Sequence, residues 1–259
     1  MLGEFIRCFD RDSFFAHVNC NYLTHTQSEM SQKSRALLVN WLLLVHQKFA
    51  FRNQTFLLAV NILDLFCSRV ALPSKQFQLL AVTVFFIAAK FEEVKPPKLS
   101  KLLFVSENIF TSDEVIGFEA VILDVIGYKL STNSPLQLLE IKAARKGLDS
   151  ATCQTAAWFL IATCFDLRMY EFGCEQIVDS CLLMAECVSN NFENDVGSVI
   201  ADLGSRFGSH LISAGEKGSL CMKYMSLIVL NLERAGLLAI RKMFPLARVN
   251  CPKTDSAAN

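Results

Sequence analysis

The stretch QFQLLAVTVFFIAAKF, residues 76–91, decides the fold. From Leu79 onward it is apolar on nearly every side of a helix, and such a helix must be surrounded by other elements. Two prolines, Pro96 and Pro97, follow this stretch and fit the first turn of another helix, because proline is tolerated there but not in a helix interior. We therefore predict that residues 76–91 form the central helix of a helical domain.

The segments on both sides repeat apolar residues at three- and four-residue spacing, which is typical of amphipathic helices. The 6 prolines and 11 glycines lie mainly between such segments, and Thr111 with Glu114 matches a capping box. We therefore predict an all-α protein with a break between two five-helix halves at residues 131–135. Besides 76–91 and the helix after Pro97, the predicted helices span residues 34–49, 54–70, 113–128, 136–146, 151–167, 175–188, 196–211 and 220–242.

Composition limits the kinds of partner. The chain has 259 residues, of which 52% are hydrophobic and 19% charged, so it has apolar surface to spare for a core and a protein partner. Its 25 basic and 25 acidic residues cancel, which argues against nucleic acid or an acidic membrane held by bulk charge. The longest strongly apolar run, residues 79–89, is shorter than the roughly 20 residues of a membrane-spanning helix.

No pattern in the sequence indicates catalysis or metal binding. The ten cysteines form no CxxC pair and no ligand spacing with the four histidines, so we expect no metal and no cofactor. Free cysteines in this number favour a reducing compartment inside the cell. The sequence contains no nucleophile elbow, phosphate-binding loop, dinucleotide fingerprint or zinc-protease motif. Glu92 and Glu93 are not a catalytic pair by spacing, because neighbours on a helix point in different directions.

Two charged residues stand out among apolar neighbours. Lys90 lies at the end of the central helix, where it is either a plain solvated terminus or part of a site. Glu119, in the segment VIGFEAVILDVIGY, either rims an apolar patch or lies on the solvated face of its helix. This segment has more apolar residues than one side of a helix can bury in the core. The remaining apolar residues favour a surface that binds a protein partner.

Three segments together carry a resemblance to a known family. They read SRALLVNWLLLVHQKFAFRNQTFLLAVNILDLF, QLLAVTVFFIAAKFEEVKPP and NIFTSDEVIGFEAVILDVIGYKL, the last followed by SPLQLL. In order, spacing and wording they resemble the cyclin box of A/B-type mitotic cyclins, and the second half resembles a more divergent second cyclin fold. The resemblance implies two tandem five-helix cyclin folds with a short N-terminal helix, in segment 5–15. The implied domains are an N-terminal helix and linker at 1–30, the cyclin box at 31–131, the second fold at 132–246 and a disordered tail at 247–259.

The resemblance also implies a regulatory subunit, with no catalytic residue of its own, that binds and activates a cyclin-dependent kinase in the cell cycle. We expect it in the nucleus and cytoplasm. The positions that match the family's kinase contacts are Lys90, Phe91, Glu119, Leu123, Tyr128 and Leu130. A transcription-type cyclin, or the core of a cyclin-fold transcription factor, is the alternative; the latter would need a basic face, which the balanced charge does not favour.

Two further features follow from the resemblance. Arg35 and Asp64 match a buried ion pair between the first two helices of the box, and this pair would be structural. A second set of positions matches a groove for Arg-x-Leu motifs of substrates or inhibitors, with Ser34 in place of the usual methionine and Leu44 in place of an A-type glutamate. Because leucine does not pair with a guanidinium, we expect a weak arginine preference. The groove positions are Leu37, Leu38, Trp41 and Gln78, of which Leu37 and Trp41 are alternatively core residues.

Overall fold

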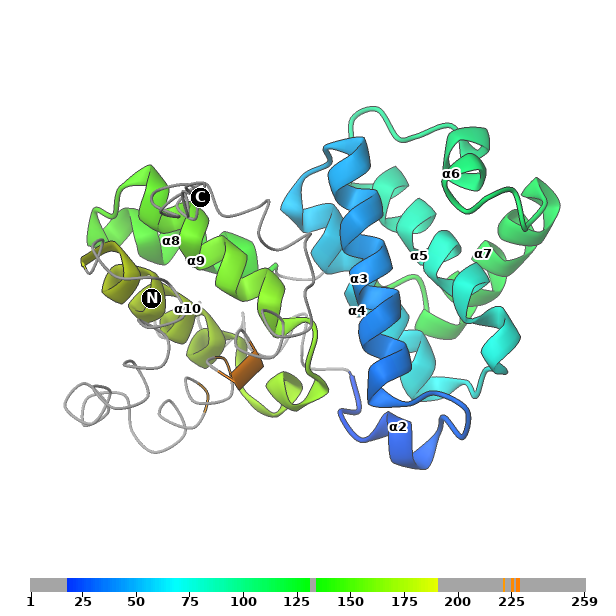
Figure 1. Ribbon diagram of the computed structural model, residues 1–259, viewed down its shortest axis with the longest axis horizontal. Helices are drawn as coiled ribbons and strands as arrows, with labels where there is room; N and C mark the ends of the chain where they lie inside the picture. The colour runs from blue at the N-terminus through cyan, green and yellow to red at the C-terminus, as the bar shows by residue number, and fades with distance from the viewer. Residues whose placement is uncertain (1–17, 131–133, 191–220, 222–224, 226, 229–259) are drawn as a thin grey trace, which may run out of the picture.

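The computed structural model describes residues 18–130 and 134–190, together with Cys221, Met225, Leu227 and Ile228. These residues form helices joined by turns, and no strand occurs among them. Figure 1 shows two groups of helices side by side. We call residues 18–130 the N-terminal lobe and residues 134–190 the C-terminal lobe. The all-α prediction is therefore confirmed for the described part of the chain.

The helices follow the order that the sequence predicts. The N-terminal lobe contains α2 (Tyr22–His25), α3 (Gln32–Phe49), α4 (Asn53–Arg69), the 3-10 helix η1 (Ser74–Gln76), α5 (Phe77–Glu92), α6 (Leu99–Val105) and α7 (Ser112–Ile126). The C-terminal lobe contains α8 (Pro135–Lys146), α9 (Ser150–Thr163), the 3-10 helix η2 (Leu167–Glu171) and α10 (Cys174–Asn190).

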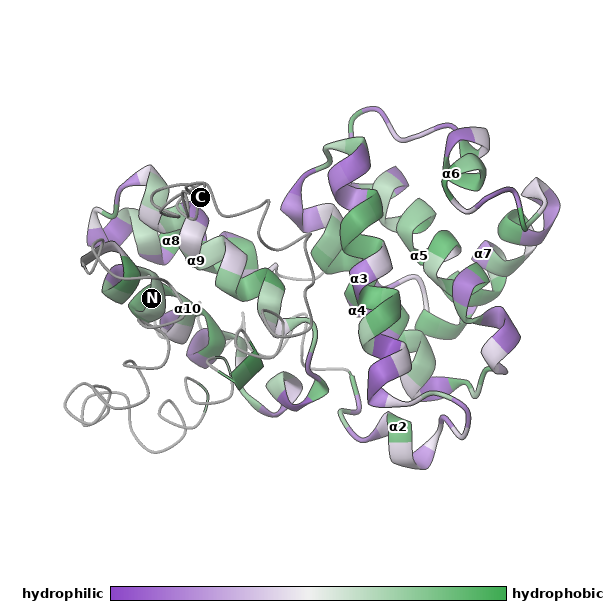
Figure 2. Ribbon diagram, viewed as in Figure 1, coloured by the Kyte–Doolittle hydropathy of each residue, from purple (hydrophilic) through white to green (hydrophobic). Residues whose placement is uncertain are grey.

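Helix α5 is the centre of the N-terminal lobe, as its sequence predicts. It packs against α3, α4, α6 and α7, and residues such as Leu80, Val84 and Phe85 are completely buried. Figure 2 shows the hydrophobic residues along this helix. Burying side chains of this size contributes about 1.5–3 kcal/mol each, so the apolar run of α5 is a large part of the lobe's stability.

Local signals at the helix ends also agree with the sequence. The Thr111 hydroxyl accepts from the Glu114 N–H at 3.3 Å, and the Thr111 N–H donates to the Glu114 carboxylate at 2.7 Å, which is the predicted capping box. At the other end of α7, Gly127 adopts φ +67°, a left-handed conformation that glycine tolerates best. The helix therefore ends at Ile126, two residues before the predicted end at residue 128.

One predicted helix is too long. The segment predicted as 151–167 leaves the α-helix after Thr163, and the chain continues in η2. Asp166 is the N-cap of η2, and its carboxylate accepts from the Arg168 N–H at 3.0 Å, which favours the new 3-10 helix over a continued α-helix. The predicted N-terminal helix in segment 5–15, the predicted helix 196–211, most of 220–242 and the predicted tail at 247–259 lie outside the described residues. The number of five helices in the second half therefore stays a prediction.

A buried ion pair joins the helices and the two lobes. Arg35 of α3 contacts both carboxylate oxygens of Asp64 on α4, through Nε and Nη2 at 2.7 Å each, and both side chains are 0% exposed. The same Nη2 donates to the Cys164 carbonyl in the C-terminal lobe at 2.8 Å. Nearby, the Gln32 side chain donates to the Phe165 carbonyl at 3.2 Å. The guanidinium thus neutralises a charge in one lobe and satisfies a carbonyl of the other.

Two tyrosines complete the surroundings of Asp64. The Tyr22 hydroxyl of α2 donates to Oδ1 at 2.8 Å, and the Tyr170 hydroxyl of η2 donates to Oδ2 at 2.6 Å. Burial, together with the Asp64 charge, raises the pKa of both phenols well above the usual value, so they stay protonated and act as donors. We refer to Tyr22, Arg35, Asp64 and Tyr170 as the Arg35 cluster.

Glu93, the residue that follows α5, caps the start of α4. The N-cap residue of α4, Arg52, has no side-chain cap of its own. Glu93 supplies one: its Oε1 accepts from the Arg52 N–H at 2.9 Å and from the Thr55 hydroxyl at 2.5 Å. Its other oxygen lies 3.8 Å from Arg52 Nε. A carboxylate at a helix N-terminus also interacts favourably with the helix dipole, so Glu93 fixes the end of α5 against the start of α4.

We expect Arg35→Met to lower the free energy of unfolding by about 3–5 kcal/mol, because it leaves the buried Asp64 carboxylate without its cation. The double variant Arg35→Met/Asp64→Leu should be more stable than this single variant, since no unpaired charge remains. Tyr170→Phe should cost about 1.5–3 kcal/mol for one hydrogen bond to a charged group. Urea unfolding followed by circular dichroism measures all three. Equal stability of Arg35→Met and the wild type would contradict the role of the cluster.

For the cap, we expect Glu93→Ala to cost about 1–2 kcal/mol, in the range of a lost N-cap. Its neighbour offers a matched control, because Glu92 contacts Arg52 only through a 3.7 Å ion pair at the surface. Glu92→Ala should change stability by less than about 0.5 kcal/mol. Thermal unfolding compares the two variants, and an equal loss in both would show that Glu93 is no cap.

Candidate functional site

Lys90 and Glu119 lie together although 29 positions separate them in the sequence. The packing of α5 against α7 brings them into contact, and Lys90 Nζ forms an ion pair with Glu119 Oε1. The lysine is 40% exposed and the glutamate 13%. Lys90 Nζ also lies 4.5 Å from the centre of the Phe86 ring, one helical turn earlier. Glu119 is therefore at the rim of an apolar surface and not on a fully solvated face.

Exposed apolar side chains lie close to both members of this pair. Phe91, next to Lys90 at the end of α5, is 48% exposed, and Ile116, three residues before Glu119 on α7, is 53% exposed. Leu123 is half-buried and packs against the core. An ion pair with exposed aromatic and aliphatic neighbours is the composition of a protein-binding surface, in which charges fix the register and apolar groups supply affinity.

The end of α7 positions Tyr128 and Leu130. The Tyr128 N–H donates to the Leu123 carbonyl at 2.9 Å, which closes the helix after Gly127. Tyr128 itself adopts φ +57° and is 66% exposed, whereas Leu130 is half-buried against the core. A tyrosine in a left-handed conformation is uncommon, and its ring here has little contact with its own chain. We call Lys90, Phe91, Glu119, Leu123, Tyr128 and Leu130 the α5–α7 surface.

The predicted groove positions lie on α3 and at the start of α5, two helices that pack against each other. Leu37 is 59% exposed and so is not a core residue, whereas Leu38 and Trp41 are half-buried against the core. Gln78 is half-buried in the first turn of α5. Leu44 follows Leu37 and Trp41 on the same side of α3 by helical spacing and is 46% exposed. This face of α3 therefore presents apolar groups without an acidic one at Leu44.

The described residues contain no group of metal ligands, and their buried thiols include some that are protonated at neutral pH. No group of three His, Cys, Asp or Glu side chains in the described ranges is placed to hold a metal ion. The eight described cysteines all carry free thiols. Burial raises the pKa of the Cys164 thiol to about 12 and that of Cys221 to about 11, so both are protonated at neutral pH. None of the described helices combines the length and apolar character needed to cross a bilayer.

The sequence did not point to Tyr22, Tyr170 or the Cys164 carbonyl as partners of the ion pair. Their contacts depend on where α2 and the C-terminal lobe dock, and no local spacing encodes that. The link from Glu93 to Arg52 and Thr55 was also missed. A signal for it exists: α4 starts without a Ser, Thr, Asp or Asn at its N-cap, which requires an acceptor from elsewhere.

Comparison with known proteins gives a family match to the description "Cyclin, N-terminal domain" over residues 5–131. Among similar curated proteins is the G2/mitotic-specific cyclin-B1 of Carassius auratus, 34% identical over 59% of this chain and 38% of its own length. The G2/mitotic-specific cyclin-B of Dictyostelium discoideum is 30% identical over 61% of this chain and 36% of its own length. Cyclin-B1-2 of Arabidopsis thaliana is 39% identical over 41% of this chain and 24% of its own length. The chain thus spans well under half the length of these relatives.

Among solved structures, a viral cyclin from herpesvirus saimiri matches with a TM-score of 0.63 and 19% sequence identity. The match covers 87% of this chain and 97% of that protein. At this identity the likeness concerns the fold alone. It shows that the helical arrangement in Figure 1 is that of a cyclin fold.

Proposed function

Because this chain belongs to the cyclin family through its N-terminal domain at residues 5–131, we propose that it is a regulatory subunit that binds and activates a cyclin-dependent protein kinase. The observation that carries the proposal is the α5–α7 surface, where the Lys90–Glu119 ion pair is bordered by exposed apolar side chains. Its B-type relatives support a role at G2 and mitosis. The proposed place of action is the nucleus and cytoplasm.

In this proposal the chain performs no chemistry itself. The apolar groups Phe91, Leu123, Tyr128 and Leu130 pack against the kinase C-helix, and Lys90 and Glu119 bond to polar groups of the kinase and fix the register of docking. A C-helix held inward lets its glutamate pair with the catalytic lysine of the kinase, and the activation segment opens. Such an interface should bury upwards of roughly 2,000 Å² in total. ATP binding and phosphoryl transfer stay in the partner.

The ion pair itself suits this role. Lys90 and Glu119 neutralise each other while the surface is free, so the apolar patch carries little net charge. On docking, each group exchanges part of this contact for hydrogen bonds across the interface. Removing either one leaves the other unpaired in a desolvated contact, which costs more than the loss of a solvent-exposed pair.

We expect the double variant Lys90→Ala/Glu119→Ala to bind a candidate cyclin-dependent kinase about tenfold or more weakly than the wild type. Reconstitution with the kinase measures binding by calorimetry and activation by histone phosphorylation. Lys146→Ala/Glu186→Ala is a matched control, because it removes a Lys–Glu pair of similar exposure in the C-terminal lobe. The control should bind and activate like the wild type. Full activation by the Lys90→Ala/Glu119→Ala variant would show that the proposed contact site is wrong.

We also propose that the face of α3 around Leu37, Leu38 and Trp41, with Gln78, docks short Arg-x-Leu segments of substrates or inhibitors. The exposure of Leu37 and Leu44 supports it. Leu44 offers no carboxylate, so the leucine of the motif should contribute most of the affinity and the arginine little.

For this groove we expect Trp41→Ala to weaken binding of an Arg-x-Leu peptide while helicity is retained. Leu44→Glu should instead strengthen binding of Arg-x-Leu by about 0.5–1 kcal/mol without strengthening Ala-x-Leu, because a carboxylate on this face pairs with the guanidinium. Fluorescence anisotropy with both peptides measures the difference. An equal change for the two peptides in Leu44→Glu would place the arginine elsewhere.

A further inference from the structure

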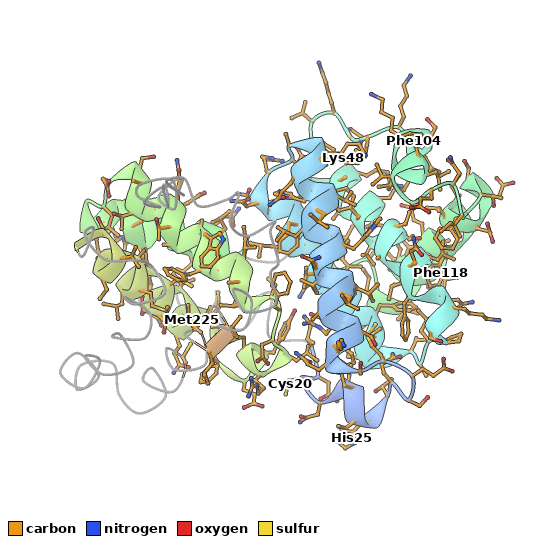
Figure 3. The ribbon with its side chains drawn as sticks, viewed as in Figure 1. Cys20, His25, Lys48, Phe104, Phe118 and Met225 are labelled. Atoms are coloured by element: carbon orange, nitrogen blue, oxygen red, sulfur yellow. The ribbon has the colours of Figure 1, made fainter. Side chains whose placement is uncertain are left out.

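A second exposed surface lies where α3 ends beside α6. Phe104 on α6 is 69% exposed, which is unusual for a phenylalanine in a chain with a large core. Lys48, in the last turn of α3, places its Nζ 6.0 Å from the centre of the Phe104 ring. Figure 3 shows these two labelled side chains at the same end of the N-terminal lobe. An aromatic ring and an ammonium group thus meet at the surface.

Two more lysines extend this surface. Lys98 is the N-cap residue of α6, and Lys101 lies in its first turn. Lys98, Lys101 and Phe104 follow one another at intervals of three residues, and positions three apart are neighbours on a helix surface. Both lysines are exposed. We call Lys48, Lys98, Lys101 and Phe104 the α6 surface.

The charges of this surface are uncompensated. Within the described ranges, no ion pair joins Lys48, Lys98 or Lys101 to a carboxylate, whereas Lys90 has one and Lys142 has two. Glu107 follows Phe104 by three residues, in the turn after α6, but it forms no ion pair with these lysines. Because the chain as a whole has a formal charge of zero, this is a local concentration of positive charge and not part of a general one.

The connection between α5 and α6 carries the same combination of groups. Val94 is 93% exposed, and Lys95 beside it is exposed as well. In the sequence these residues follow Phe91, Glu92 and Glu93 and lead from the end of α5 toward α6.

We propose that the α6 surface binds an acidic segment of a partner protein, in which carboxylates alternate with aliphatic or aromatic residues. Carboxylates pair with Lys48, Lys98 and Lys101, and an apolar side chain of the segment packs on the Phe104 ring. The exposed ring can pack on an apolar side chain or stack on a base, so the net charge of the chain decides between a peptide and a nucleic acid. The zero net charge provides none of the long-range attraction on which polyanion binding depends. This proposal does not depend on kinase activation by the α5–α7 surface.

The test uses the full chain and a fluorescein-labelled peptide in which glutamate alternates with leucine and phenylalanine, measured by fluorescence anisotropy. We expect Lys98→Glu/Lys101→Glu and Phe104→Ser each to weaken binding about tenfold or more. The matched control is Lys75→Glu/Arg145→Glu, which makes the same change in net charge at exposed positions elsewhere. It should lower affinity by no more than about threefold, through general charge alone. Circular dichroism verifies that all variants are folded.

Two further probes separate the contributions. A peptide with glutamine in place of glutamate, and one with serine in place of leucine and phenylalanine, should both bind weakly, because each lacks one half of the recognition. Single-stranded RNA and vesicles containing anionic lipid should bind more weakly than the acidic peptide. The proposal is overturned if the wild type does not bind the peptide, if the control variant loses as much affinity as Lys98→Glu/Lys101→Glu, or if RNA or vesicles bind as tightly. Kinase activation measured on the same variants reports separately on the α5–α7 surface.

Discussion

The structure depends on satisfying one buried charge, the guanidinium of Arg35. A cation removed from water is stable only when its charge is neutralised, and Asp64 does this for Arg35 through bonds to Nε and Nη2. Nη2 also donates to the Cys164 carbonyl, whereas the buried Nη1 has no hydrogen-bond partner within the described part of the chain. Asp64 in turn accepts from phenols of α2 and η2. The mutual position of the two lobes follows from these bonds. They also fix the rotation of α3 about its axis, and with Arg35 facing inward, Leu37 faces out toward solvent.

The fold could be predicted largely because its main signals are local. The all-round apolar run of α5 requires a central position, and the Thr111–Glu114 capping box sets the start of α7. The clearest error occurred where a polar side chain competes with the apolar periodicity. The apolar pattern of α9 continues past Thr163, but the N–H groups of the next three residues donate to carbonyls three residues earlier, and the Asp166 carboxylate accepts from the Arg168 N–H in η2. Nothing in the periodicity of α9 contains that information.

In the candidate site, too, the sequence indicates single residues, whereas their contacts depend on the packing of the helices. Lys90 and Glu119 each stood out as charged residues in apolar surroundings, yet only the packing of α5 on α7 makes them a pair. The exposure of Phe104 and Leu37 is likewise a property of packing, because both occur in segments with many similar apolar residues that are buried. Composition indicated that apolar surface would be left over. Which apolar residues stay exposed depends on how the other helices pack against each helix.

The buried thiols have a practical consequence for following motions of this protein. Cys67 lies in the core of the N-terminal lobe, and Cys181 lies in the core of the C-terminal lobe; each is 0% exposed. Because burial also raises the pKa of both thiols, an alkylating reagent modifies them only after the surrounding helices separate. Their separate labelling rates would therefore time the opening of each lobe without any engineered probe. Cys67 and Cys181 are therefore natural reporters of local unfolding, one in each lobe.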